Sequence, residues 1–159
     1  MRPTRVGTLV ALLVGAAAAS WGVLRIAESR GAILPRLPWT APFGIALIGV
    51  VVLVSAIALR SRLRGSPGTT PPQPIGVARM AVLGKASSHV GPLLGGMYGG
   101  YALILLPDLD IEGRRERALV AVVAVFAALF LTAAGLVMER ICRVRPPGDD
   151  TAGPPAGLP

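Results

Sequence analysis

The chain has 159 residues, of which 53% are hydrophobic and only 15% are charged. Soluble domains carry roughly 25% charged residues, and one core of this size cannot bury so much apolar surface. The composition therefore argues against a soluble globular domain and favours an integral membrane protein. A net charge of +8 would suit a nucleic-acid partner in a soluble protein, but here the basic residues flank apolar segments, so we expect no nucleic-acid partner.

Four segments, uncharged apart from one histidine, are long enough to cross a bilayer. About 20 apolar residues at 1.5 Å rise cover a hydrocarbon layer about 30 Å thick. Each segment should be helical, because backbone groups in lipid must be satisfied within the segment. The expected spans are residues 6–24, 41–59, 88–106 and 118–138. The sequence thus predicts an all-α, polytopic membrane helix bundle with four transmembrane helices, occupying residues 1–145.

The segments around these spans are more polar. Residues 60–74 are rich in Arg, Ser and Pro, and we expect a cytoplasmic linker there. Residues 75–87 form an apolar lead-in that carries Arg79 and Lys85 and begins after Pro74, which suits a helix start. This lead-in either continues into the third span as one long helix or lies flat in the membrane interface. Residues 146–159 are expected to be a disordered tail.

Basic residues set the expected orientation, because short loops rich in Lys and Arg stay in the cytoplasm. With four spans, both termini and the middle loop share one side, which has ten such residues: Arg2, Arg5, Arg60, Arg62, Arg64, Arg79, Lys85, Arg140, Arg143 and Arg145. The other side has six: Arg25, Arg30, Arg36, Arg114, Arg115 and Arg117. The preference for Arg over Lys is typical of a GC-rich bacterial genome. We therefore expect a multi-pass protein of the bacterial cytoplasmic membrane with both termini cytoplasmic, its basic face beside anionic lipid.

The first span has a second interpretation. Arg2 and Arg5, the apolar run and the small residues 16–20 resemble a secretory signal with a cleavage site. Apolar character continues through Leu24, however, beyond the roughly 7–15 residues of a signal core. We favour a retained span over cleavage, which would leave three spans.

The third span carries a stripe of small residues. Ser87, Gly91, Gly95 and Gly99 recur every four residues and so share one helical face, which Gly96 and Gly100 widen. Such a face lets another backbone approach closely. Similar stripes occur in the first span, with Gly7, Ala11, Gly15 and Ala19, and in the fourth, with Ala124, Ala128 and Thr132.

These stripes predict that the third helix packs inside the bundle, against the first helix. Two further interpretations stay open: the third-span stripe serves oligomerisation or a foreign helix, or its glycines and Pro92 mark an irregular, moving segment.

Three polar residues near the cytoplasmic end of the third span are candidates for function: Arg79, Lys85 and His89. His89 is the single histidine and could serve a proton path, although no carboxylate lies within any span to complete a relay. An interfacial histidine with a satisfied hydrogen bond is the simpler interpretation. We identify no catalytic, cofactor-binding or metal-binding motif, and with one histidine and no buried acid we expect no enzyme and no cofactor.

The start Met1–Val6, the pairs Ala78-Arg79 and Lys85-Ala86, and the run from Ser87 through Gly91, Gly95 and Gly99 to Tyr101 give the chain a family resemblance. It resembles an uncharacterised family of small four-helix membrane proteins of unknown function from high-GC Gram-positive bacteria. Genes of that family often lie beside folate-biosynthesis genes. The resemblance implies four spans and a membrane location, and it implies no activity.

Two functional hypotheses follow. The first is a non-enzymatic structural or accessory subunit that acts through glycine-stripe helix packing, with a membrane-protein partner or a second copy of itself. The second is a small transporter or channel subunit whose glycine-rich third span moves or lines a pore. The lack of intramembrane charge and of inverted-repeat symmetry argues against the second.

Overall fold

The computed structural model describes residues 6–31, 37–63, 74–108, 110 and 112–143. Over these residues the chain is all-α. Helix α1 runs Val6–Ser29, α2 runs Thr40–Leu63, α3 runs Pro74–Leu105 and α4 runs Glu112–Arg143, with a short 3-10 helix, η1, at Leu106–Asp108. The predicted all-helical class with four long helices is confirmed.

Three of these helices are long and apolar enough to cross a membrane: Val6–Ser29, Thr40–Arg62 and Glu112–Cys142. Helix α3 does not join them by composition, because its glycines and serines, together with His89, lower its mean hydropathy. The described part of the chain therefore has three candidate membrane spans and one long helix of mixed polarity.

The helices extend beyond the apolar spans expected from the sequence, because polar residues stabilise their ends. Gly31 follows α1 with a φ of +75°, and its N–H donates to the carbonyl of Glu28 over 2.9 Å. A glycine in the left-handed region is a common helix end. Arg60 and Arg62 lie in the last turn of α2 and Glu112 in the first turn of α4, where each charge opposes the helix dipole.

The lead-in at residues 75–87 belongs to α3, which is one continuous helix. Of the two courses left open by the sequence, the structure therefore has the long helix. At 1.5 Å per residue α3 is about 48 Å long. Helix α2 continues to Leu63, so the expected linker at 60–74 begins within a helix. The rest of that linker up to residue 73, and the expected tail at 146–159, lie outside the described residues.

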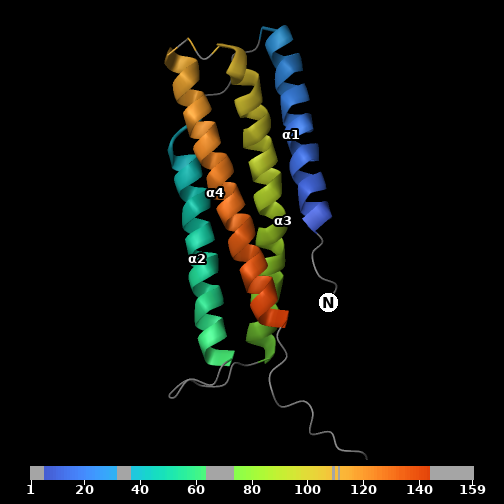
Figure 1. The fold of residues 1–159 in the computed structure, drawn as a ribbon, viewed down its shortest axis with the longest axis vertical. Helices are drawn as coiled ribbons and strands as arrows, with labels where there is room; N and C mark the ends of the chain where they lie inside the picture. Colours follow the sequence, from blue (N-terminus) through green and yellow to red (C-terminus); the bar gives the residue numbers. More distant parts are fainter. Residues whose placement is uncertain (1–5, 32–36, 64–73, 109, 111, 144–159) are drawn as a thin grey trace, which may run out of the picture.

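The four helices stand side by side in the order α2, α4, α3, α1 (Figure 1). Helix α3 packs along both α1 and α4, and α4 packs along α2, whereas α2 barely approaches α3. Helices α1 and α2 do not pack together, although they are consecutive in the sequence. In an up-and-down bundle with short loops, consecutive helices are usually neighbours. The arrangement is therefore an open row in which α1 packs along α3 alone.

The buried apolar residues form two clusters, and helix α4 contributes to both. One cluster joins α2 to α4 and consists of Ile45, Val52, Ala56, Ala127, Ala128, Leu131, Ala134 and Met138. A second cluster joins the end of α3 to the start of α4 and consists of Tyr101, Ile104, Leu105, Ala118 and Ala121. Helix α1 contributes one buried apolar residue, Leu9, among the described residues.

Candidate functional site: the two faces of helix α3

One face of α3 packs against α4 without room for side chains. A Cβ added at Gly91 would lie 2.8 Å from the carbonyl oxygen of Ala128, and one at Gly84 would lie equally close to a side chain of α4. From the other side, a Cβ added at Gly135 of α4 would lie 2.6 Å from the backbone nitrogen of Ser88. Since real Cβ atoms do not approach backbone this closely, glycine is required on both helices for their contact.

The neighbouring face of α3 packs against α1. A Cβ added at Gly96 would lie 2.7 Å from the Cβ of Ala16, and both Gly96 and Gly100 face carbonyl oxygens of α1, those of Leu13 and Ala17. The two backbones approach one another as in other small-residue membrane interfaces, where Cα–H···O contacts add to dispersion. The prediction that α3 packs against α1 is confirmed at these two glycines.

A hydrogen bond crosses the same interface. The hydroxyl of Ser20 on α1 donates to the carbonyl oxygen of Met97 on α3 over 2.9 Å. Interhelical bonds of this kind contribute about 0.6 kcal/mol on average in membranes.

The predicted stripe of α3 is divided between its two neighbours. Ser87 and Gly91 are buried toward α4, whereas Gly96 and Gly100 face α1 and do not simply widen the first stripe. Gly95 and Gly99 have more room: the nearest atom to an added Cβ is 3.5 Å away at Gly95 and 4.0 Å away at Gly99. The glycines of α3 thus serve two separate helix contacts.

The small residues that the sequence predicted as the packing stripe of α1 do not pack against α3. Gly7, Ala11, Gly15 and Ala19 are all exposed, and a Cβ added at Gly7 or Gly15 would meet nothing within 4 Å. Helix α1 instead turns the face around Ala16 and Ser20 toward α3. The physical reason is that the glycines of α3 already allow the two helix backbones to approach closely. Helix α1 therefore needs no glycines of its own at this contact.

An apolar groove lies between α1 and α3. Its volume is about 690 Å³, and apolar side chains supply most of its wall. Its lining residues are Ala16, Ala19, Ser20, Val23, Leu24, Leu37, Leu93, Leu94, Met97, Tyr98 and Tyr101. We refer to it as the α1–α3 groove.

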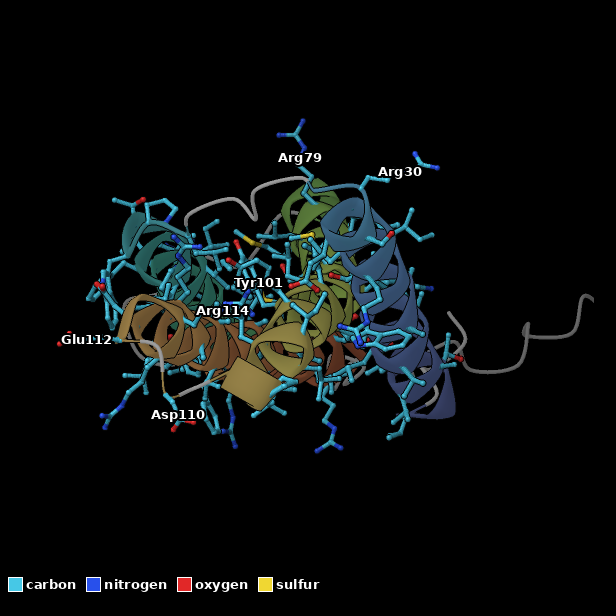
Figure 2. The ribbon with its side chains drawn as sticks, turned by 90° about the horizontal axis from the view of Figure 1, so that it is seen from above. Arg30, Arg79, Tyr101, Asp110, Glu112 and Arg114 are labelled. Carbon is cyan, nitrogen blue, oxygen red and sulfur yellow. The ribbon has the colours of Figure 1, made fainter. Side chains whose placement is uncertain are left out.

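Charged residues gather where the groove ends at Tyr101, at the end of the row where α1 and α3 finish and α4 begins. The guanidinium group of Arg117 lies near the Tyr101 side chain. Glu28 at the end of α1 is 3.6 Å from a guanidinium nitrogen of Arg114 and 3.5 Å from one of Arg25. Figure 2 shows Tyr101 and Arg114 directed between the helices. We refer to this as the Tyr101 end.

The other labelled charged residues point away from the row. In Figure 2, Asp110, Glu112 and Arg30 extend outward, and so does Arg79. Of the arginines at the Tyr101 end, Arg25 and Arg114 both form ion pairs with Glu28.

Of the candidate residues at the opposite end of α3, His89 makes contacts within its own helix. Arg79 and Lys85 are exposed, and His89 is half-buried. The Nδ1 of His89 lies 2.8 Å from the carbonyl oxygen of Lys85 and 3.3 Å from the hydroxyl of Ser88. The imidazole is thus held within its own helix, as the simpler interpretation predicted.

The comparisons with known proteins agree with this picture at the level of family. A family model described as a protein of unknown function (DUF3180) matches residues 9–146. The chain belongs to the DUF3180 family. The resemblance to an uncharacterised family is thereby confirmed. No curated protein and no solved structure matches the chain.

In this DUF3180 protein, sequence reasoning missed several contact residues. Gly84 and Gly135 form part of the α3–α4 contact, and Gly49 of α2 lies under the ring of Phe130, which an added Cβ would approach to 2.7 Å. The signal was present for Gly84, because small residues continue one turn before Ser87. Gly49 lies in a uniformly apolar helix, where one glycine carries no pattern.

Proposed function

We propose that this protein is a four-span, non-enzymatic accessory subunit of the bacterial cytoplasmic membrane, with both termini cytoplasmic, and that α1 carries its partner-binding face. The partner supplies a transmembrane helix that lies on the exposed stripe of α1, and a second copy of the chain is one form of such a partner. The proposal includes neither a cofactor nor nucleic acid, as expected from the composition.

The observation that carries the proposal is the direction of the α1 stripe. Gly7, Ala11 and Gly15 lie on the face of α1 opposite Leu13 and Ala16, and an added Cβ at either glycine meets nothing. Small residues spaced by four on a membrane helix suit close helix–helix contact. On a face that meets only lipid, larger apolar residues would serve better. The internal contacts of α1 therefore leave this stripe free for a foreign helix.

The fourth span is supported by the position of α3. Helix α3 lies between α1 and α4 and runs along both (Figure 1). If α1 and α4 cross the bilayer, then α3, which packs between them, crosses it as well. Over the whole sequence, ten Lys and Arg residues belong to the side of Arg79 and six to the side of Tyr101, which supports a cytoplasmic position for the Arg79 end.

The alternative, a transporter or channel with α3 as its moving or pore-lining element, has less support. Gly91, Gly96 and Gly100 are in close contact with backbone atoms of α4 or α1. A sliding or opening motion of α3 would break both contacts at once. These contacts favour a fixed central helix and an accessory role.

Crosslinking in native membranes tests the proposed function. We expect a tagged wild-type chain to capture one membrane protein, and Gly15→Leu to lose it. Gly44→Leu is the matched control, because Gly44 of α2 also has nothing within 4 Å of an added Cβ. Both variants should keep the wild-type stability. Capture that is equal in both variants, or absent from the wild type, would refute the partner-binding face.

Cysteine labelling tests the topology separately. In a Cys142→Ser background, Arg30→Cys and Asp110→Cys should react with an impermeant maleimide added to intact cells, and Ser61→Cys should react only after lysis. Arg30 lies just after α1 and Asp110 between α3 and α4. Labelling of Ser61→Cys in intact cells would refute the orientation, and opposite sides for Arg30→Cys and Asp110→Cys would refute the fourth span.

A further inference from the structure

The α1–α3 groove is an uncharged site beside a membrane helix. Its volume of about 690 Å³ falls within the roughly 300–1,000 Å³ typical of small-molecule sites. Each described residue that lines it is either apolar or carries a hydroxyl group. Helix α1, one wall of the groove, is a candidate membrane span. An occupant that enters from the bilayer therefore has to be uncharged where it lies in the groove, because an unpaired charge is costly there.

The groove has one accessible hydrogen-bond donor. Both tyrosines of the chain, Tyr98 and Tyr101, line it. The hydroxyl of Tyr98 has no hydrogen-bond partner among the described residues. It is not enclosed either, because every fully buried side-chain polar atom in the described part of the chain has a partner. Tyr98 thus contributes an O–H group that an occupant of the groove can pair.

This hydroxyl belongs to a residue deep in the apolar part of the row. Gly96 and Gly100, which stand on either side of Tyr98, both lie beside Ala17 of α1. Tyr98 is therefore level with Ala17, about 10 Å along α1 from Leu24, where the uncharged run ends. The polar groups of glycerolipids lie outside the hydrocarbon layer. A glycerolipid in the groove would place only its acyl chain beside Tyr98 and leave the hydroxyl unpaired, at a cost in free energy.

An isoprenoid quinone has the properties that this site requires. Its ring carbonyls accept hydrogen bonds and carry no charge, so they enter hydrocarbon at a much lower cost than an ionic headgroup. Its planar ring suits the offset or edge-to-face packing that aromatic side chains such as tyrosine prefer. Its tail is apolar and suits the remaining wall of the groove, which includes Ala16, Leu93 and Leu94.

We propose that the α1–α3 groove binds one isoprenoid quinone. A ring carbonyl accepts a hydrogen bond from the hydroxyl of Tyr98, and the tail passes Leu93 toward the middle of the bilayer. The proposal concerns binding and includes no redox step. It rests on the membrane position of α1 in the proposed function, which the cysteine labelling described above tests by itself. It does not depend on the exposed stripe of α1 or on a protein partner.

Photo-crosslinking in nanodiscs tests the site. The full chain is reconstituted in phosphatidylcholine with an azido-substituted isoprenoid quinone, and labelled peptides are located by mass spectrometry. Unmodified quinone or diacylglycerol is added in excess as the competitor. We expect the probe to label the groove-lining segments of α1 and α3. Unmodified quinone should remove this label, and diacylglycerol should be a much weaker competitor because its polar groups do not reach Tyr98.

Matched variants locate the quinone within the row. Ala19→Phe fills the groove and should remove the label, whereas Ala18→Phe, on the exposed side of α1 outside the groove, should leave it unchanged. Tyr98→Phe removes only the hydroxyl, and the loss of one hydrogen bond should raise the quinone concentration for half-competition about fivefold. Gly15→Leu, which tests the partner-binding face, should bind quinone as the wild type does, so the two proposals fail independently.

Four results would overturn the proposal. Label that excess quinone does not remove would show partition of the probe into the bilayer. Unchanged label in Ala19→Phe would place the quinone outside the groove. Equal competition by diacylglycerol and quinone would assign the groove to a glycerolipid. Wild-type binding by Tyr98→Phe would refute the hydrogen bond on which the choice of a quinone depends.

Discussion

Two adjacent glycines of α3 offer a sharp test of the helix contacts. A Cβ at Gly96 would lie 2.7 Å from the Cβ of Ala16, whereas a Cβ at Gly95 would lie 3.5 Å from that of Ala128. A relaxed carbon–carbon contact is about 3.5–4.0 Å. Gly96→Ala therefore forces α1 away from α3 by about 1 Å, and Gly95→Ala requires no movement.

The free energies of the two variants should differ in sign. Overpacking costs about 1–3 kcal/mol, and alanine gains about 1 kcal/mol over glycine in a helix. The net destabilisation of Gly96→Ala should thus be up to about 2 kcal/mol. Gly95→Ala should gain up to about 1 kcal/mol. The two neighbouring alanines are expected to differ by about 2 kcal/mol.

Reversible unfolding by SDS in mixed lipid–detergent micelles measures this difference. In a Trp39→Phe background, fluorescence from Trp21 on α1 reports the contact directly, because the backbone of Trp21 lies beside Gly100. The reasoning would be refuted if Gly96→Ala were as stable as the wild type. It would equally fail if Gly95→Ala lost as much stability as Gly96→Ala.

Three further outcomes are expected from the same unfolding assay. Gly91→Ala should destabilise the contact of α3 with α4 by about 1–3 kcal/mol through overpacking, whereas Gly99→Ala, with 4.0 Å to the nearest atom, should be neutral or stabilising; equal effects would contradict the structure. Ser20→Ala removes an interhelical hydrogen bond and should cost about 0.6 kcal/mol, so a loss above about 2 kcal/mol would point to a different role. Glu28→Gln breaks a pair with Arg114 that is about one-third exposed and should cost less than about 1 kcal/mol, shrinking with added salt; a large, salt-independent loss would contradict a solvated pair.

Much of the architecture could be read from apolar run length. The uncharged stretches starting at Val6, Ala41 and Ala118 each lie inside a helix that the structure shows. Their ends extended further than expected, because Arg60, Arg62 and Glu112 continue helices as charged caps that run length does not register. The family resemblance was also correct at the level of an uncharacterised family.

Helix pairing was harder to predict, because periodicity shows which residues share a face and not which neighbour the face meets. The stripe through Gly91 and the pair Gly96 and Gly100 looked like one broad surface, yet α4 and α1 each take a part of it. Gly7 and Gly15 have the spacing of a packing face and lie exposed. The Tyr101 end joins Glu28 to Arg114 across most of the sequence, and local patterns do not reveal such contacts.

The open row also dictates an order of assembly. Helix α1 packs along α3, and α2 packs along α4. Each of the two early helices is therefore followed in synthesis by one other helix before its own neighbour is made. At about 5–20 residues per second, α1 and then α2 wait alone in the bilayer for several seconds of synthesis. Helices α1 and α2 do not bury each other's surfaces as a hairpin, because these two helices do not pack together. Until α3 arrives, the face of α1 around Ala16 and Ser20 has no neighbour, and an insertion factor has its longest opportunity to engage α1 then.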